Sequence, residues 1–117
     1  MKQVLLDTSF IITCIKQKID FFNDIVFMSF EILIPQQVIE ELKRLSKSNS
    51  NAKIALKLLE KNRFKKINLQ LKNVDRGIIK YAEKHQELII ATLDREIKKE
   101  IQNQKLVIRG KTRIEMS

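Results

Sequence analysis

The sequence contains few of the residue types from which several common active sites are built. Cys14 is the only cysteine and His85 the only histidine, which excludes an internal disulfide, a cysteine-built zinc site and a histidine-rich metal cluster. The single histidine also disfavours a serine or cysteine nucleophile that depends on histidine as its base. Gly77 and Gly110 are the only glycines, too few for a P-loop or a dinucleotide-binding loop, so we expect no bound nucleotide cofactor.

Long hydrophobic runs are also missing. No apolar run approaches the roughly 18 residues that a membrane span requires. Asp7 interrupts the first apolar run, where a signal peptide would continue its core. We therefore expect a cytoplasmic protein with no membrane partner. Apolar residues make up 44% of the chain, so we expect residues 1–117 to form a single domain. Its core is expected to include all six phenylalanines: Phe10, Phe21, Phe22, Phe27, Phe30 and Phe64.

Positive charge is in excess. The 23 Lys and Arg residues outnumber the 14 Asp and Glu residues, and the formal net charge is +9. Such a surface attracts polyanions. Nucleic acid is the leading partner on charge alone, ahead of an anionic membrane. A lysine-rich surface that is simply solvated explains the same composition, so charge indicates a partner without indicating any chemistry.

Apolar runs alternate with amphipathic segments along the whole sequence. The runs typical of strands are residues 2–6, 31–34, 64–69, 88–93 and 106–108. The segments that favour helices are residues 10–17, 19–28, 35–45, 52–61, 74–84 and 94–101. Thr8 and Ser9 are expected to cap the first helix, and residues 46–51 to form a loop. The alternation predicts an α/β fold in three layers, with a parallel sheet and helices on both of its faces.

Two aspartates directly follow predicted strands. Asp7 ends the run 2–6, and Asp94 follows the run 88–93. In open parallel sheets, ligands bind beyond the carboxyl ends of the strands. We therefore expect these two carboxylates to lie close together if their strands are neighbours.

Two further acidic residues lie at the edges of apolar helix stripes. At about 100° per residue, Glu41 falls roughly 80° from the centre of the stripe of its helix, whereas Glu40 points into water. Asp75 occupies a similar edge position in the first turn of the helix 74–84. Glu41 and Asp75 are thus able to face inward.

Each acidic residue also has a purely structural explanation. Asp7, Asp75 and Asp94 suit helix caps, and Glu41 suits a solvated helix surface. An inward Glu41 beside three such aspartates is less easily explained by capping. Clustered carboxylates repel one another and persist most easily around a cation. Oxygen ligands without His or Cys select Mg²⁺ or Mn²⁺, and such ions beside a basic surface are suited to phosphodiester hydrolysis.

Four short segments, in this order, resemble the PIN-domain ribonucleases. They are Val-Leu-Leu-Asp-Thr-Ser-Phe-Ile-Ile at 4–12, Pro-Gln-Gln-Val-Ile-Glu-Glu-Leu at 35–42, Asp-Arg-Gly-Ile-Ile at 75–79 and Ala-Thr-Leu-Asp-Arg-Glu-Ile at 91–97. The resemblance implies a doubly wound sheet of about five parallel strands and an endoribonuclease dependent on Mg²⁺ or Mn²⁺. It further implies an acidic quartet of catalytic and metal-binding residues, Asp7, Glu41, Asp75 and Asp94, supported by Ser9 and Thr92.

Within that family, two groups are similar to this chain. Residues 95–101 and 109–116 resemble the end of the archaeal-type PIN endonucleases that process small-subunit ribosomal RNA, which implies a role in ribosome biogenesis. VapC-type toxins are the second relative, and they imply an antitoxin partner. Asp75 is followed by Arg76 where the rRNA-processing relatives often carry paired aspartates. This departure keeps open a catalytically weak RNA-binding assembly factor.

Basic residues near the end of the chain are the expected RNA contacts. They are Lys98, Lys99, Arg109, Lys111 and Arg113. We expect residues 109–117 to form a basic tail that Gly110 makes flexible. The apolar stretch 19–30 is a candidate surface for pairing two copies into a homodimer.

Overall fold

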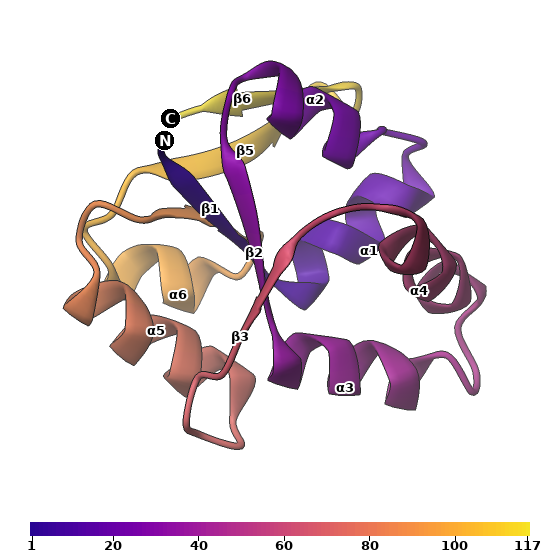
Figure 1. Cartoon of the computed structure of the whole chain (residues 1–117), viewed down its shortest axis with the longest axis horizontal. Coiled ribbons are helices and arrows are strands. Elements are labelled where there is room, and N and C mark those ends of the chain that lie inside the picture. The colour runs from indigo at the N-terminus through magenta and orange to yellow at the C-terminus, as the bar shows by residue number, and fades with distance from the viewer.

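Strands and helices alternate along the chain in a computed structural model that describes residues 1–117 (Figure 1). The strands are β1 (Gln3–Leu6), β2 (Glu31–Pro35), β3 (Lys65–Ile67), β4 (Ile89–Ala91), β5 (Lys105–Arg109) and β6 (Arg113–Met116). The helices are α1 (Thr8–Lys16), α2 (Phe21–Phe27), α3 (Gln36–Leu45), α4 (Ser50–Lys61), α5 (Val74–Lys84) and α6 (Arg95–Glu100). None of these helices is both long enough and apolar enough to cross a membrane.

All six strands form one sheet in the order β3-β2-β1-β4-β5-β6. The first five are parallel, and β6 runs antiparallel to β5. The chain builds outward from β1 to β2 and β3, then returns to place β4 on the other side of β1. The β1–β4 boundary is therefore the point where the strand order reverses, and the carboxyl ends of both strands meet there, Leu6 opposite Ala91.

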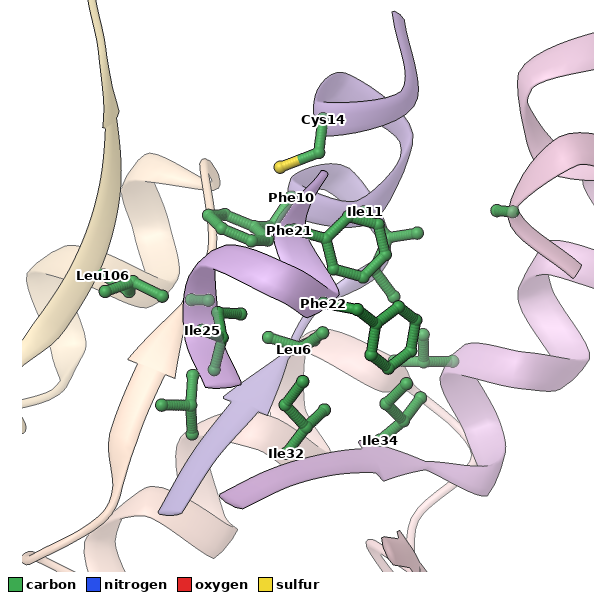
Figure 2. Close-up of a cluster of buried hydrophobic side chains, with 14 of the residues drawn as sticks. Leu6, Phe10, Ile11, Cys14, Phe21, Phe22, Ile25, Ile32, Ile34 and Leu106 are labelled. Atoms are coloured by element: carbon green, nitrogen blue, oxygen red, sulfur yellow. The ribbon is translucent and has the colours of Figure 1, made fainter. Parts of the chain in front are cut away.

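Helices cover both faces of the sheet, as the sequence predicts. Successive residues of a strand point to opposite faces, so Val4 and Leu6 join one buried cluster while Leu5 joins another. The larger cluster packs α1 to α4 on one face, and Figure 2 shows its aromatic and aliphatic side chains. The smaller cluster packs α5 and α6 on the other face. The predicted three-layer α/β/α architecture is confirmed.

The end of the chain differs from the expected flexible tail. Residues 105–116 form a β-hairpin, with Arg109 paired to Arg113. Ile114 is buried at the sheet edge, which supplies the apolar contact that holds the second strand. Gly110 and Lys111 both have positive φ, as in the type I′ turns that join antiparallel strands. The prediction of a flexible arm at 109–117 was therefore wrong, and the sheet has six strands.

Phe27 was wrongly assigned to the core. Phe10, Phe21 and Phe22 are buried, and Phe30 and Phe64 are half-buried against the larger cluster, but the side chain of Phe27 is 80% exposed. The buried positions of α2 are its first two residues and Ile25. A residue two positions beyond Ile25 lies about 200° further around a helix, so Phe27 points away from the core.

Some element boundaries are shifted by local capping. Asn49 caps α4 by accepting hydrogen bonds from the N–H groups of Asn51 (2.9 Å) and Ala52 (3.2 Å), so this helix begins inside the predicted loop 46–51. β3 is restricted to three residues of the run 64–69. Helix α5 spans the predicted residues 74–84.

Candidate active site at the carboxyl ends of β1 and β4

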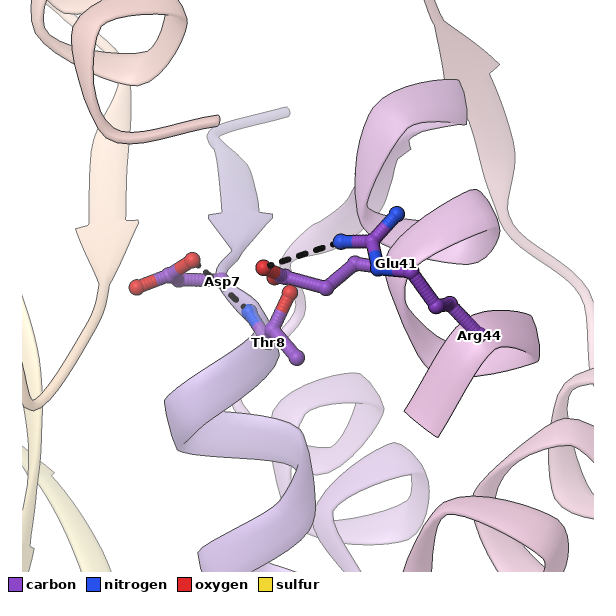
Figure 3. A network of polar contacts seen from close by, with 4 residues as sticks. All are labelled: Asp7, Thr8, Glu41 and Arg44. Atoms are coloured by element: carbon purple, nitrogen blue, oxygen red, sulfur yellow. Dashed lines mark hydrogen bonds and ion pairs between the residues drawn. The ribbon is translucent and has the colours of Figure 1, made fainter. Parts of the chain in front are cut away.

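Asp7 lies where β1 turns into α1, and it is 3% exposed. Its main-chain N–H donates to the Ala91 carbonyl of β4 (2.9 Å), which continues the β1–β4 pairing by one residue. The Asp7 Oδ1 atom accepts the Thr8 N–H at 2.8 Å, so Asp7 itself is the cap of α1 (Figure 3). The prediction that Thr8 and Ser9 cap this helix was wrong, because the preceding carboxylate already takes that position.

Two hydroxyl groups hold the other oxygen of this carboxylate. Asp7 Oδ2 accepts the Thr92 hydroxyl at 2.6 Å and the Ser9 hydroxyl at 3.2 Å. Each hydroxyl oxygen in turn accepts a main-chain N–H from the chain after β4: Thr92 from Asp94 (3.1 Å) and Ser9 from Leu93 (3.2 Å). The turn after β1 and the turn after β4 are thereby joined through the Asp7 carboxylate.

Asp94 caps the helix that follows β4. Its Oδ1 atom accepts the N–H groups of Glu96 (2.8 Å) and Ile97 (3.1 Å) at the start of α6. Both capping hydrogen bonds use the same oxygen, which leaves Oδ2 without a hydrogen bond in the structure. The capping explanation considered for this residue is thus compatible with a ligand role for its second oxygen.

Glu41 reaches the site from α3. The predicted orientation is confirmed: the Glu41 side chain is 30% exposed, whereas Glu40 is exposed. Figure 3 shows the Glu41 carboxylate extending toward the junction of β1 and α1. One of its oxygens lies 3.7 Å from Nη2 of Arg44, one turn further along the same helix. Arg44 therefore places a positive charge beside Glu41.

Asp75 lies in the first turn of α5 without capping that helix. The cap is Asn73, whose side-chain oxygen accepts the Arg76 N–H at 2.9 Å. The capping explanation for Asp75 is therefore wrong. The Asp75 carboxylate makes neither a hydrogen bond nor an ion pair in the structure.

The charges of the four acidic residues influence one another. Burial raises the pKa of Asp7, hydrogen bonds from Thr92, Thr8 and Ser9 lower it, and the charge of Asp75 adds to the rise. The pKa of Asp75 is raised by partial desolvation and by the charges of Asp94 and Glu41. The charge of Asp75 is thus coupled to those of the three other carboxylates, although the Asp75 residue itself is exposed to solvent.

The donor set suits a hard divalent cation, although no preformed cage is present. No three Asp, Glu, His or Cys side chains in the chain are close enough together to enclose a metal ion. The available ligands are all oxygens, and the carboxylates repel one another in the absence of a cation. In addition, the buried Thr8 hydroxyl beside Asp7 has no hydrogen-bond partner. These features fit Mg²⁺ or Mn²⁺ better than Zn²⁺.

Two residues of this site are missing from the sequence-based prediction. Arg44 contacts Glu41, and its i, i+3 spacing from an acidic residue is the signal that identifies the pair. The Thr8 hydroxyl was assigned to capping, and its unpartnered state is visible only in the folded structure.

The predicted RNA-contacting residues lie on two elements. Lys98 and Lys99 form the last turn of α6, and Arg109 lies at the end of β5. Arg109 pairs with Glu115 across the hairpin at 3.4 Å. The hairpin turn that carries Lys111 lies beside α2, because Thr112 and Arg113 line a hollow together with residues 23–28.

Comparisons with known proteins show the family of this fold. A family described as "PIN like domain" matches residues 4–112. The chain is 33% identical to "Ribonuclease VapC4" of Methanocaldococcus jannaschii over 109 residues, which cover 86% of this chain and 83% of that protein. The solved PIN domain of the endonuclease Utp24 is similar with a TM-score of 0.84 and 26% identity, covering 98% of this chain and 90% of that one. The chain belongs to the PIN-like domain family.

Proposed function

We propose that this protein is an endoribonuclease that depends on Mg²⁺ or Mn²⁺. The observation that carries the proposal is the hydrogen-bonded junction of Asp7 with the turn that carries Asp94, made through Thr92 and Ser9 at the point where the strand order reverses. The names of both relatives, a ribonuclease and an endonuclease, support the same activity. The net charge of +9 supports a polyanionic substrate.

In this proposal, Asp7 and Asp94 would hold the first ion, and Glu41 and Asp75 would complete the site directly or through water. A bound ion supplies an activated water and neutralises charge on the attacked phosphate. Ser9 and Thr92 fix the orientation of the Asp7 carboxylate through their hydroxyl groups. The Asp75 carboxylate has no protein partner to compete with a ligand. Arg44 lies beside Glu41 on the same helix.

The activity is tested by cleavage of structured RNA in Mg²⁺ or Mn²⁺ by wild type, Asp7→Asn and Glu41→Gln. We expect both variants to lose at least about 100-fold in rate, because each removes a proposed metal ligand. Glu40→Gln is the matched control, since Glu40 is the exposed neighbour on the same helix. Wild-type rates for Asp7→Asn and Glu41→Gln would contradict the site assignment.

We favour ribosomal RNA as the substrate, in a cytoplasmic role in ribosome biogenesis. The support is the resemblance of residues 95–101 and 109–116 to the rRNA-processing PIN endonucleases. Selective cleavage of a small-subunit rRNA precursor fragment over tRNA is the expected result. A chain that binds such fragments without a metal requirement and leaves their length unchanged would instead be an RNA-binding assembly factor, the alternative suggested by Arg76.

A toxin ribonuclease held by an antitoxin is the second candidate, supported by the 33% identity to VapC4. This candidate shares the chemistry and differs in its biology. It predicts growth arrest when the protein is expressed alone, relief of that arrest by Asp94→Asn, and a small antitoxin reading frame beside the gene. Growth unaffected by expression of an active enzyme would exclude it.

We also propose that two copies pair through α2. Val26 and Phe27 are 61% and 80% exposed, an unusual exposure for large apolar side chains on neighbouring positions. Phe27→Glu is expected to convert a dimer to a monomer, measured by light scattering. A wild-type monomer at high concentration would contradict this pairing.

A further inference from the structure

Two hollows lie side by side along the loop that joins β3 to α5. The first, of about 510 Å³, is lined by Gln37, Glu40 and Arg44 of α3 and by Lys72, so that one carboxylate lies among its cations. The second, of about 460 Å³, is lined on α5 by Lys80, Tyr81, Lys84 and His85. Both are lined by the same three loop residues, Asn68, Gln70 and Leu71. The loop 68–71 is therefore the wall that the two hollows share.

Specific contacts fix this loop between α3 and α5. The Gln37 side chain donates to Asn68 Oδ1 (2.8 Å) and accepts the Leu69 N–H (3.1 Å). Leu69 packs on Gly77 of α5, where an added Cβ would lie only 2.9 Å from the Leu69 Cβ. The absence of a side chain at Gly77 allows this close approach. The wall is thus held from both sides.

Tyr81 and His85 form a stacked pair in the second hollow. Their ring centroids are 4.2 Å apart, with 23° between the planes. His85 Nδ1 lies 2.9 Å from the Tyr81 carbonyl, which can only accept, so Nδ1 carries the hydrogen and Nε2 remains for a ligand. Asn103 is buried and donates to the His85 carbonyl at 2.9 Å, which fixes the main chain beneath the ring.

The charged side chains of this hollow suit a phosphate backbone. Lys80 and Lys84 are exposed, lie one helical turn apart on α5 and form no ion pair with an acidic side chain. A positively charged groove with an aromatic platform is the arrangement that binds single-stranded nucleic acid, because phosphates meet cations while a base stacks on the ring. An acidic peptide would satisfy the lysines but would leave the stacked rings without a matching group.

The groove leads away from the acidic site. Asp75 lies in the first turn of α5 and His85 just beyond its end, about 15 Å apart at 1.5 Å per residue. At its other end, the first hollow includes Arg44, which contacts Glu41. Arg44 therefore links the first hollow to Glu41, and the second hollow continues from the first to the aromatic pair at the end of α5.

We propose that the α5 groove, defined by Lys80, Tyr81, Lys84, His85 and the loop 68–71, binds single-stranded RNA that flanks the cleaved bond. One base stacks on the Tyr81–His85 pair, and the adjacent phosphates contact Lys80 and Lys84. This inference rests on the proposed function and extends it. It places a recognition subsite on the face of the sheet covered by α5, away from the hairpin residues expected from the sequence to contact RNA.

The chain supplies an internal probe for this subsite. Tyr81 is its only tyrosine and it has no tryptophan, so the intrinsic tyrosine emission comes from Tyr81 alone. Titration with a single-stranded oligouridylate in EDTA, where a metal-dependent enzyme does not cleave, is expected to quench this emission. A labelled copy of the same oligonucleotide gives the dissociation constant by fluorescence anisotropy.

Matched variants separate stacking from charge. We expect His85→Ala to weaken binding about 5- to 20-fold with little change in salt dependence. Lys80→Ala/Lys84→Ala should also weaken binding and should reduce the slope of log K against log salt by about 1.4, because two phosphate contacts are lost. Lys53→Ala/Lys57→Ala is the control, since it removes two exposed lysines one turn apart on α4, across the sheet. Circular dichroism verifies that each variant is folded.

Three results would contradict the proposal that the α5 groove binds RNA. They are wild-type affinity in both α5 variants, an equal loss in the α4 control, or Tyr81 quenching by polyglutamate that displaces the RNA. The outcome is independent of the catalytic proposal. If wild type cleaves RNA and the α5 variants bind RNA as tightly as wild type, the groove proposal is contradicted and the endoribonuclease proposal is not. If the α5 variants bind RNA more weakly and wild type does not cleave RNA in Mn²⁺, the groove proposal is supported and the endoribonuclease proposal is contradicted.

Discussion

Asp7 is a buried residue that can carry a charge. The free energy that folding loses by burying this charge depends on pH. Burial places the pKa of Asp7 above its ordinary value of 3.8. The folded state then binds more protons than the unfolded state between the ordinary and the raised pKa. Stability is therefore lost as the pH rises through this window. A bound cation would offset that loss.

The first prediction concerns Asp7→Asn in the absence of metal. Asparagine keeps the oxygen that accepts the Thr8 N–H and removes the buried charge. We expect the free energy of unfolding of the variant to rise relative to wild type as the pH increases above 3.8, measured by urea denaturation. Mn²⁺ should then stabilise wild type and not the variant. If the difference in the free energy of unfolding between variant and wild type did not change with pH, the destabilisation assigned to the buried Asp7 charge would be contradicted.

The Thr92 hydroxyl tests whether orientation of this carboxylate matters. Thr92→Val keeps the shape but removes the donor to Asp7 and the acceptor for the Asp94 N–H. We expect a loss of about 1–3 kcal/mol in stability, since buried polar groups lose their partners, and about tenfold slower cleavage. Thr92→Ser retains the hydroxyl and should restore most of both quantities. Slow cleavage by Thr92→Ser as well would show that the methyl group is what matters.

At the scale of elements, the two glycines act for different reasons. Gly77→Ala is expected to destabilise the protein by about 1–3 kcal/mol, because the new Cβ meets Leu69. Gly110→Ala has open space around it, yet should cost about 1–2 kcal/mol because its φ is +58°. In a Leu69→Gly background, which lacks that Cβ, the additional cost of Gly77→Ala should be smaller. Gly110→Asn should cost less than Gly110→Ala. Thermal denaturation measures the stability of each variant.

Helix positions were predictable where apolar periodicity is strong. Helix α5 has the predicted bounds because Ile78, Ile79 and Ala82 define its buried face. The hairpin at the end of the chain was not predicted, since basic residues in the turn conceal the alternation of Ile114 and Met116 with polar neighbours. The conformation of such a segment is determined by its pairing with another strand and not by its local sequence.

The candidate site was predictable in part for the same reason. Asp7 and Asp94 could be placed after strands from local patterns, and the structure confirms that β1 and β4 are neighbours. The adjacency itself depends on the sheet order, which local sequence does not determine. The Glu41–Arg44 contact and the links through Ser9 and Thr92 depend on side-chain conformations in the folded chain.

At the scale of the whole molecule, an acidic site lies within a basic protein of net charge +9. Distant basic residues attract RNA, while the carboxylates repel it unless a cation is bound. If the five basic residues of α6 and the hairpin each neutralise one phosphate, the slope of log K against log salt is about −3.5. Affinity should then fall about 100-fold between 50 and 200 mM salt. Affinity independent of salt would contradict this view of the surface.

The central claim is that four acidic residues, distant in the sequence, form one binding site for a divalent cation. Anomalous diffraction from a crystal soaked in Mn²⁺ tests it most directly. The account predicts a strong peak bounded by the carboxylates of Asp7, Glu41, Asp75 and Asp94, absent from a matched Asp7→Asn crystal. A crystal with no peak there, or with Mn²⁺ bound only elsewhere on the molecule, would contradict it.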